Sequence, residues 1–179
     1  GDVYKRQEYE DAILWLEQAG LVNKVLLSKA PKLPLKAYDD LGTFKLYTLD
    51  LGVLRKLSEL DASILLLPTP AYTEYKGALA ENYILQSLTA QFQMPFRYWT
   101  SGNKAEVDFL LQYINQIYPI EVKADQNIQG KSLIQYEKLF QPACRIRYSM
   151  LNLKQDGNLL NIPLFLADKT RELLGVINV

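Results

Sequence analysis

Three charged side chains stand inside two short apolar runs of the sequence, where charged residues are unusual. Asp108 lies in EVDFLL, and Glu121 and Lys123 lie in PIEVKA. Carboxylate oxygens are the ligands that hard divalent cations such as Mg²⁺ prefer, and an ammonium group stabilises negative charge that develops during a reaction. If the three side chains meet, they could hold a metal ion and act on a negatively charged group.

The two runs have the residue pattern of a β-hairpin. Apolar residues recur at every second position in both runs, which is the period of a strand. A turn centred near Ile114 and Asn115 places Asp108 opposite Glu121, and directly opposed residues lie about 5 Å apart at Cβ. On this register Asp108, Glu121 and Lys123 share one face of the sheet. The other face is predicted to consist of Val107, Phe109, Ile120 and Val122.

A charged sheet face also has a simpler explanation, because antiparallel sheets often expose one face to water. An acid-x-Lys triplet is expected about once in a chain of this size from ordinary usage of charged residues. Glu74 and Lys76 form such a triplet, but it lacks a surrounding strand and an aspartate on a preceding strand. The prediction therefore depends on the spacing and context of the hairpin residues, which are expected on a solvent-exposed face.

At these residues the sequence resembles the PD-(D/E)XK, or restriction-endonuclease-like, nuclease superfamily. There, an acid on one strand and an acid-x-Lys on the next form the site, and many members add a glutamate from the preceding helix. Glu81 in ALAENYILQSL matches that glutamate, although a helix-flank charge that reaches water is the alternative. The resemblance implies that Mg²⁺ or Mn²⁺ binds and a phosphodiester is cleaved. The implied metal ligands are Asp108, Glu121, the backbone carbonyl of Val122, and Glu81.

Each of these residues has a role in the implied mechanism. Asp108 and Glu121 would hold the ion, which would polarise the phosphate and lower the pKa of a bound water. Lys123 would orient that water or stabilise charge on the phosphoryl oxygens. Glu81 would complete the ligand set or hold a water of a second metal.

A longer part of the chain, including AENYILQSL, RYWTSGNKAEVDFLL and YPIEVKA, resembles a domain of unknown function that follows a P-loop ATPase module in bacterial and archaeal AAA-type proteins. We place this resemblance over residues 9–174. Within that range, the part before the nuclease-like domain resembles a winged-helix-like segment. No G-x-x-x-x-G-K-[ST] motif occurs, so ATP would bind only to a module that is absent from this chain. The implied partners are that ATPase module, nucleic acid (DNA in the first instance) and further copies in a homo-oligomer.

The remaining pattern predicts an α/β fold: a restriction-endonuclease-like mixed sheet flanked by helices and preceded by a partial winged-helix-like segment. Helices are expected over residues 8–19, 51–60, 78–91 and 131–140 and at the C-terminus. Strands outside the hairpin are expected over residues 21–28, 44–49, 96–100, 145–150 and 162–166. Two prolines after SILLL indicate a boundary. The predicted divisions are a lead-in over 1–7, which is either a fragment boundary or an artefact, the winged-helix-like segment over 8–70 and the nuclease-like domain over 71–179.

Composition restricts the chemistry further. The sequence contains no His, which excludes imidazole-dependent triads and His-ligated zinc sites within this chain. The single Cys144 cannot form an internal disulfide, and no apolar run approaches the roughly 20 residues that span a bilayer. We therefore expect a cytoplasmic protein without a membrane partner. The formal net charge of zero argues against strong stand-alone affinity for nucleic acid.

Three classes of function stay open on this basis. The first is a metal-dependent nuclease domain. The second is a nucleic-acid-binding module with a weak or inactive site, and the third is a protein-interaction domain that serves the missing ATPase. Metal binding separates the first two classes, and nucleic-acid binding separates the second from the third.

Overall fold

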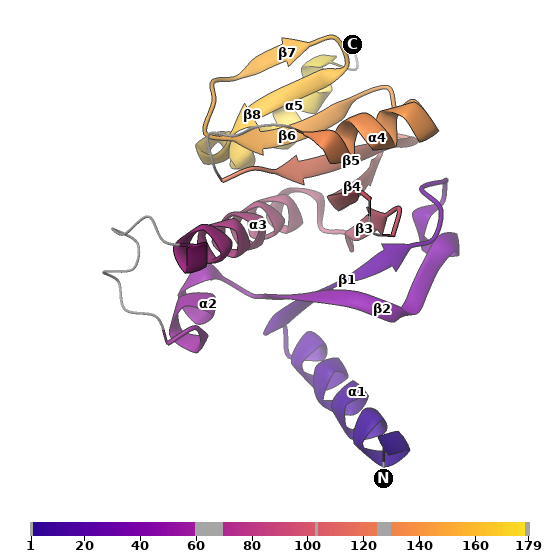
Figure 1. Cartoon of the computed structure of the whole chain (residues 1–179), viewed down its shortest axis with the longest axis vertical. Helices are drawn as coiled ribbons and strands as arrows, with labels where there is room; N and C mark the ends of the chain where they lie inside the picture. Colours follow the sequence, from indigo (N-terminus) through magenta and orange to yellow (C-terminus); the bar gives the residue numbers. More distant parts are fainter. Residues whose placement is uncertain (1, 60–69, 103, 125–129, 178–179) are drawn as a thin grey trace.

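A mixed β-sheet of eight strands runs through the chain, with helices on both of its faces (Figure 1). The computed structural model describes residues 2–59, 70–102, 104–124 and 130–177. In that part of the chain the strands are β1 (Val22–Ser28), β2 (Asp39–Thr48), β3 (Arg97–Thr100), β4 (Glu106–Tyr113), β5 (Gln116–Val122), β6 (Arg145–Ser149), β7 (Lys154–Asp156) and β8 (Leu159–Pro163). Their order across the sheet is β2-β1-β3-β4-β5-β6-β8-β7.

Five α-helices accompany these strands in the described residues. They are α1 (Asp2–Gln18), α2 (Leu51–Leu57), α3 (Pro70–Phe92), α4 (Lys131–Phe140) and α5 (Thr170–Ile177), together with the 3-10 turns η1 (Leu35–Tyr38) and η3 (Leu164–Lys169). The predicted mixed α/β fold is confirmed at this level. None of the described helices is long and apolar enough to cross a bilayer.

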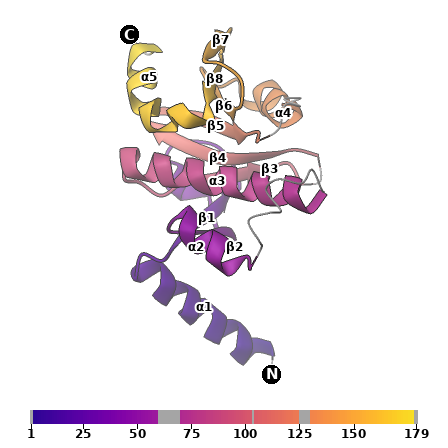
Figure 2. The ribbon, with the colours of Figure 1, turned by 90° about the vertical axis from the view of Figure 1, so that its left-hand side faces the viewer.

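The helices cover the centre of the sheet from both sides. Helix α3 buries Ile84 and Leu88 against Phe109 and its neighbours on one face. Helix α4 buries Leu133 and Tyr136 in a second apolar cluster on the other face. Figure 2 shows α4 and α5 on opposite sides of β6 and β8. The central strands therefore have no broadly solvated face.

The hairpin of β4 and β5 has the register predicted from the sequence. Its pairs run from Phe109 and Ile120 to Tyr113 and Gln116. The turn residues Ile114 and Asn115 have φ values of 45° and 57°, which is the left-handed backbone that a two-residue turn of type I′ requires. Asn adopts this conformation readily, whereas a β-branched residue does so rarely. The alternation of the two strands, more than the turn residues, therefore made the hairpin predictable.

Several predicted elements differ from those observed. Helix α3 begins at Pro70 instead of residue 78. Proline can begin a helix because the N–H groups of the first turn make no hydrogen bond within the helix. The last predicted strand, residues 162–166, is wrong in its bounds: β8 ends at Pro163, and η3 follows. The edge strand β7 was not predicted. Helix α1 includes residues 2–7, which the sequence analysis had assigned to a lead-in.

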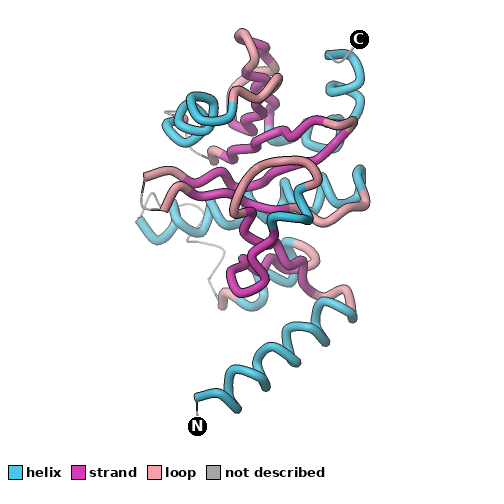
Figure 3. Tube along the Cα trace, turned by 90° about the vertical axis from the view of Figure 1, so that its right-hand side faces the viewer, coloured by secondary structure: helices cyan, strands magenta, loops and turns pink. Residues whose placement is uncertain are grey.

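The segment upstream of residue 70 belongs to the same sheet as the rest of the chain. Strands β1 and β2 form an antiparallel pair, and β1 pairs in parallel with β3 through Leu26 and Arg97. This arrangement extends the sheet beyond β3, and α1 projects away from it (Figures 1 and 3). The winged-helix interpretation and the boundary at residue 70 stay predictions. Residues 60–69, which adjoin that boundary, lie outside the described part.

A buried ion pair joins β2 to β3 across β1. Arg97 donates to both carboxylate oxygens of Asp39 at 2.8 Å and to the carbonyl of Pro95. The side chains of Arg97 and Asp39 are only 10% and 9% exposed. A planar guanidinium bonded at two points to one carboxylate fixes both distance and orientation, so the pair holds the β1–β2 hairpin against the start of β3.

We expect Asp39→Ala to lower the free energy of unfolding by about 3–5 kcal/mol, because the buried guanidinium of Arg97 loses its charged partner. The measurement is urea denaturation followed by circular dichroism. Asp156→Ala is the control: that carboxylate is 82% exposed, and its loss should change stability by no more than about 0.5 kcal/mol. Similar losses in the two variants would contradict the structural role of Asp39.

Candidate functional site

The site begins where the backbone ladder of the hairpin ends. Phe109 and Ile120 are the last pair on that side of the hairpin. Beyond them, the backbone N–H of Val122 donates to Oδ2 of Asp108 at 2.7 Å. The Asp108 carboxylate therefore takes the place of a backbone acceptor at the point where the two strands separate.

A β-bulge in β4 accompanies this change. Between the pairs Arg97–Leu110 and Trp99–Val107, β3 advances by two residues and β4 by three. As a result, Val107 packs in the cluster on the α4 side, whereas Phe109 packs in the cluster on the α3 side. The prediction that Val107 shares a face with Phe109 is wrong for this reason. Bulges re-aim side chains where strand pairing ends, and Asp108 lies at such a point.

Asp108 is held in surroundings that disfavour its charge. Burial, and then the charge of Glu81, raise its pKa, and the charge of Glu121 adds to this rise. The Val122 N–H and the ammonium group of Lys45 act in the opposite sense. The net result is a pKa of about 7 instead of 3.8. A cation close to this carboxylate would relieve the unfavourable charge.

Glu121 is more buried than the hairpin pattern predicted. Only 2% of its side chain is exposed, and its Oε1 lies 3.1 Å from Nζ of Lys123. Its Oε2 has no hydrogen-bond partner, and no other buried side-chain nitrogen or oxygen in the described residues lacks one. The expectation of a solvent-exposed charged face is wrong for Glu121, because helices cover both faces of the sheet centre. The Lys123 side chain is 33% exposed and remains within reach of solvent.

Glu81 approaches Asp108 from α3. Its Oε2 accepts a hydrogen bond from the hydroxyl of Tyr47 at 2.9 Å, so it is not simply a helix-flank charge in water. The structure thus brings Glu81 into the electrostatic environment of Asp108. Within the residues described, however, no three acidic or thiol side chains form a ready-made metal cluster. The nearby Val122 contributes its N–H to Asp108, as described above.

Sequence reasoning missed the contribution of β2. Nζ of Lys45 pairs with Oε1 of Glu106 and lies 5.0 Å from the centre of the Tyr98 ring. Burial lowers the pKa of Lys45. The hydrogen bond and charge of Glu106, together with the charges of Glu81 and Asp108, raise it by more, so the net pKa is raised. We call Glu81, Glu106 and Asp108, the carboxylates that act on Lys45, the acidic cluster.

Tyr47 completes the contribution of β2. Burial, followed by the charge of Glu81 and the hydrogen bond to it, raises the pKa of Tyr47 well above its usual range, so the hydroxyl stays protonated. The available sequence signal was FKLYT, in which Lys45 and Tyr47 are two residues apart and therefore share a strand face. That strand was predicted, but it was assigned to a segment separate from the hairpin.

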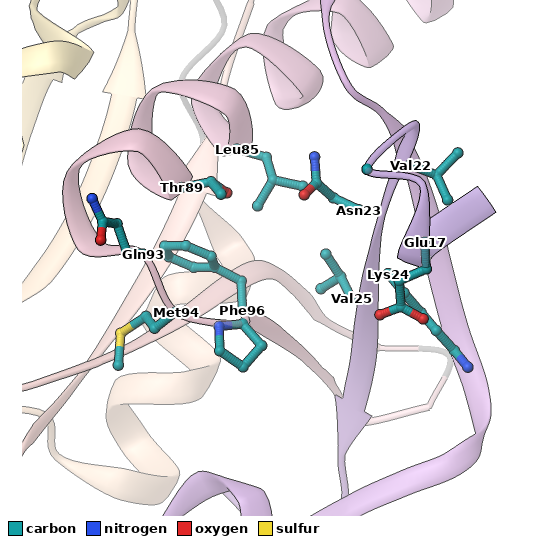
Figure 4. Close-up of a pocket in the computed structure, with 12 residues that line it drawn as sticks. Glu17, Val22, Asn23, Lys24, Val25, Leu85, Thr89, Gln93, Met94 and Phe96 are labelled. Atoms are coloured by element: carbon teal, nitrogen blue, oxygen red, sulfur yellow. The ribbon is translucent and has the colours of Figure 1, made fainter. Parts of the chain in front are cut away.

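A cavity of about 290 Å³ lies between α3 and β1 (Figure 4). Leu85, Thr89 and Gln93 of α3 line one side, and Val25 and its neighbours line the other. Neither the predicted site residues nor the acidic cluster lines this cavity. The chemistry suggested by the sequence is therefore located at the hairpin end and not in this hollow.

The described residues define a mixed α/β protein with a half-buried, charged site at the end of a hairpin. Residues 76–165 match the model of a domain of unknown function (DUF4143), and the chain belongs to that family. The predicted resemblance to a domain of unknown function is thereby confirmed over a range narrower than residues 9–174. Residues 2–64 match the model of a second domain of unknown function (DUF8612). No curated protein and no solved structure matches the chain.

The raised pKa of Asp108 predicts how stability depends on pH without metal. The folded protein binds the Asp108 proton more tightly than the unfolded chain, whose ordinary pKa is 3.8. This contribution therefore lowers the free energy of unfolding as pH rises from about 4 to about 7. Asp108→Asn should remove it, so the variant should gain stability relative to wild type across that range. Urea denaturation in EDTA between pH 4 and pH 8 measures the difference, and parallel profiles for the two proteins would contradict the prediction.

Proposed function

We propose that this chain is the C-terminal part of an AAA-type ATPase-associated protein and carries a Mg²⁺-dependent nuclease domain of the PD-(D/E)XK, restriction-endonuclease-like kind. The observation that carries the proposal is the unpartnered Oε2 of Glu121, which is a buried carboxylate oxygen. An unsatisfied buried acceptor costs free energy, and each such group in a folded protein calls for an explanation. A divalent cation that takes oxygen ligands would provide one.

The donor set fits such an ion. Asp108 and Glu121 supply hard carboxylate oxygens, and the backbone carbonyl of Val122 and the carboxylate of Glu81 would complete the set. Mg²⁺ is usually bound through one or two carboxylates, several waters and substrate phosphates, so a preformed cluster of three acids is not required. When bound, the ion would polarise the scissile phosphate and lower the pKa of a coordinated water.

The protein's own residues would orient the site. The Val122 N–H fixes the Asp108 carboxylate, and the Tyr47 hydroxyl fixes that of Glu81. Glu121 holds the ammonium group of Lys123, which would stabilise negative charge that builds on the phosphoryl oxygens. Side chains that are fixed before the reaction need no reorganisation during it.

The order of elements also supports the proposal. Helix α3, strands β3, β4 and β5, helix α4 and strand β6 follow one another along the chain. The sequence predicts the same order of helix, three strands, helix and strand, and the acidic residues lie on the predicted helix and strands. The proposed substrate is nucleic acid, DNA in the first instance. The proposed partners are the ATPase module and further copies of the protein.

A second candidate is a module with a weak or inactive site that binds nucleic acid or serves the ATPase through protein contacts. The observation that favours it is that Asp108 already has partners without a metal ion. Val122 donates to its carboxylate, and Lys45 acts on it as a cation. These contacts could stabilise the fold without chemistry, so metal binding and cleavage must each be measured.

We expect the wild-type chain to bind Mn²⁺ or Mg²⁺, as measured by isothermal titration calorimetry. Asp108→Asn and Glu121→Gln should each weaken binding by at least about tenfold, because even residues that only orient metal ligands contribute that much. Glu74→Gln is a matched control, since Glu74 belongs to an acid-x-Lys triplet on α3 outside the site. Absence of binding by wild type, or equal affinity in all variants, would refute the metal site.

We expect Lys123→Ala to lower phosphodiester cleavage about a hundredfold or more, the scale seen when a preorganised charge stabiliser is removed. Its metal affinity should persist, whereas Asp108→Asn should lose metal and cleavage together. The assay uses linear, single-stranded and branched DNA and RNA with Mg²⁺ or Mn²⁺, and Lys76→Ala is the control.

The cleavage assay is repeated with the protein joined to its proposed ATPase portion, and circular dichroism checks that every variant is folded. If wild type cleaves none of the substrates above the level of Lys123→Ala and Asp108→Asn, the binding-module alternative replaces the nuclease proposal.

A further inference from the structure

A second lysine, Lys45 of β2, lies beside the carboxylates of the site, and it lies outside the part of the chain that the DUF4143 model matches. Its ammonium group pairs with Glu106 and lies over the ring of Tyr98. The Lys45 side chain is 27% exposed. The stem is thus covered while the charged end stays within reach of a molecule from solvent.

The two lysines of the site serve different carboxylates. Lys123 pairs with Glu121. Lys45, in contrast, pairs with Glu106, which lies two residues before Asp108 on β4. Lys45 also lies two residues before Tyr47, whose hydroxyl donates to Glu81. Lys45 is thus placed among the carboxylates of β4 and α3, whereas Lys123 pairs with that of β5.

Contacts with α3 fix the part of β2 that presents Lys45. The Tyr47 hydroxyl donates to Glu81. The backbone N–H of Thr48 donates to Oδ1 of Asn82 at 2.9 Å, and Nδ2 of Asn82 donates back to the Thr48 carbonyl at 3.3 Å. Lys45 lies two residues before Tyr47 and so on the same face of the strand. Its position is consequently set by the fold and not by the salt bridge to Glu106 alone.

An ammonium group and a divalent cation that share these carboxylates repel one another. A metal ion on Asp108 therefore weakens the attraction that holds Lys45 to the acidic cluster, and leaves a flexible cation beside the ion. Lysine is a compact point charge on a flexible stem that suits the binding of a phosphate. Phosphates supply most of the binding free energy in non-specific complexes with nucleic acid.

We propose that Lys45 is the residue that binds the phosphate backbone of a nucleic-acid substrate once the divalent cation occupies the site. The upstream segment of the chain then supplies the substrate contact, and the hairpin supplies the metal ligands. This inference rests on the proposed function. It adds a substrate-binding residue from outside the hairpin motif.

The first test is calorimetry with Mn²⁺ on Lys45→Met, which keeps an apolar stem over Tyr98 but removes the charge. The variant should bind Mn²⁺ at least about fivefold more tightly than wild type, because fivefold is the scale of two unit charges about 4 Å apart in water and Mn²⁺ carries two charges. Lys24→Met is the matched control: Lys24 also lies over an aromatic ring, 4.5 Å from the centre of Phe44. Val25 is paired with Lys45 and shares its face of the hairpin. Lys24 is the residue before Val25, so its side chain lies on the opposite face. The control should leave the affinity unchanged.

The second test is fluorescence anisotropy with a labelled DNA duplex and a labelled single strand in Ca²⁺, over a range of salt concentrations. Lys45→Met should weaken DNA binding and lower the slope of log K against log salt by about one, as expected for one lost phosphate contact. Lys45→Arg should restore both, and Lys24→Met should behave as wild type. Circular dichroism establishes that each variant is folded, and the Arg variant reports on charge should the Met variant unfold.

The outcomes separate the two proposals. If wild type binds no Mn²⁺, the proposed function fails, and the role of Lys45 fails with it. If wild type and Lys24→Met bind Mn²⁺ but Lys45→Met binds no more tightly, or its DNA affinity and salt slope match those of wild type, only the role of Lys45 is overturned. Loss of DNA binding in Lys45→Arg as severe as in Lys45→Met would likewise overturn it, because the positive charge is retained.

Discussion

The hydrogen bond from the Val122 N–H to the Asp108 carboxylate determines how the hairpin ends. A backbone N–H inside a sheet must be satisfied, and here a side chain satisfies it instead of the neighbouring strand. The bulge in β4 is the geometric counterpart, because the extra residue releases Asp108 from regular alternation. The same contact holds an acid in surroundings that raise its pKa. Strand separation and the orientation of the acid thus accompany one interaction, which also partly offsets the effect of burial on the pKa of Asp108.

The sequence alone was sufficient to predict those elements whose residue pattern is local. Alternation in β4 and β5 specified the turn and the register, because shifting a half-buried strand by one residue moves every side chain to the wrong face. The amphipathic helix α4 was predicted with its observed bounds, residues 131–140. Within the site, the spacing in the sequence singled out Asp108, Glu121 and Lys123, whereas Glu81 was included only because the family resemblance implied a glutamate on the preceding helix.

What the sequence could not provide depends on contacts between distant segments. The burial of Glu121 arises because α3 and α4 cover both faces of the sheet, whereas a hairpin considered alone predicts one wet face. The bulge in β4 could not be predicted, because it is defined by the pairing of β4 with β3. Lys45 and Tyr47 reach the acidic cluster because β1 and β2 extend the sheet, a neighbour relation that strand alternation does not encode. The two family matches divide the chain between β2 and the hairpin, but the charged site contains residues from both parts.

The parallel pairing of β1 with β3 also affects the order in which the protein folds during its synthesis. The β1–β2 hairpin leaves the ribosome before β3, because it comes earlier in the sequence. Leu26 therefore has no strand partner on that side until Arg97 has been synthesised. Until then one edge of β1 is unpaired, and Asp39 lacks the guanidinium to which it binds in the folded protein. Unpaired strand edges and incompletely buried apolar surfaces promote aggregation of nascent chains. During synthesis the β1–β2 hairpin is therefore most exposed to pairing with other chains in the interval before β3 has emerged.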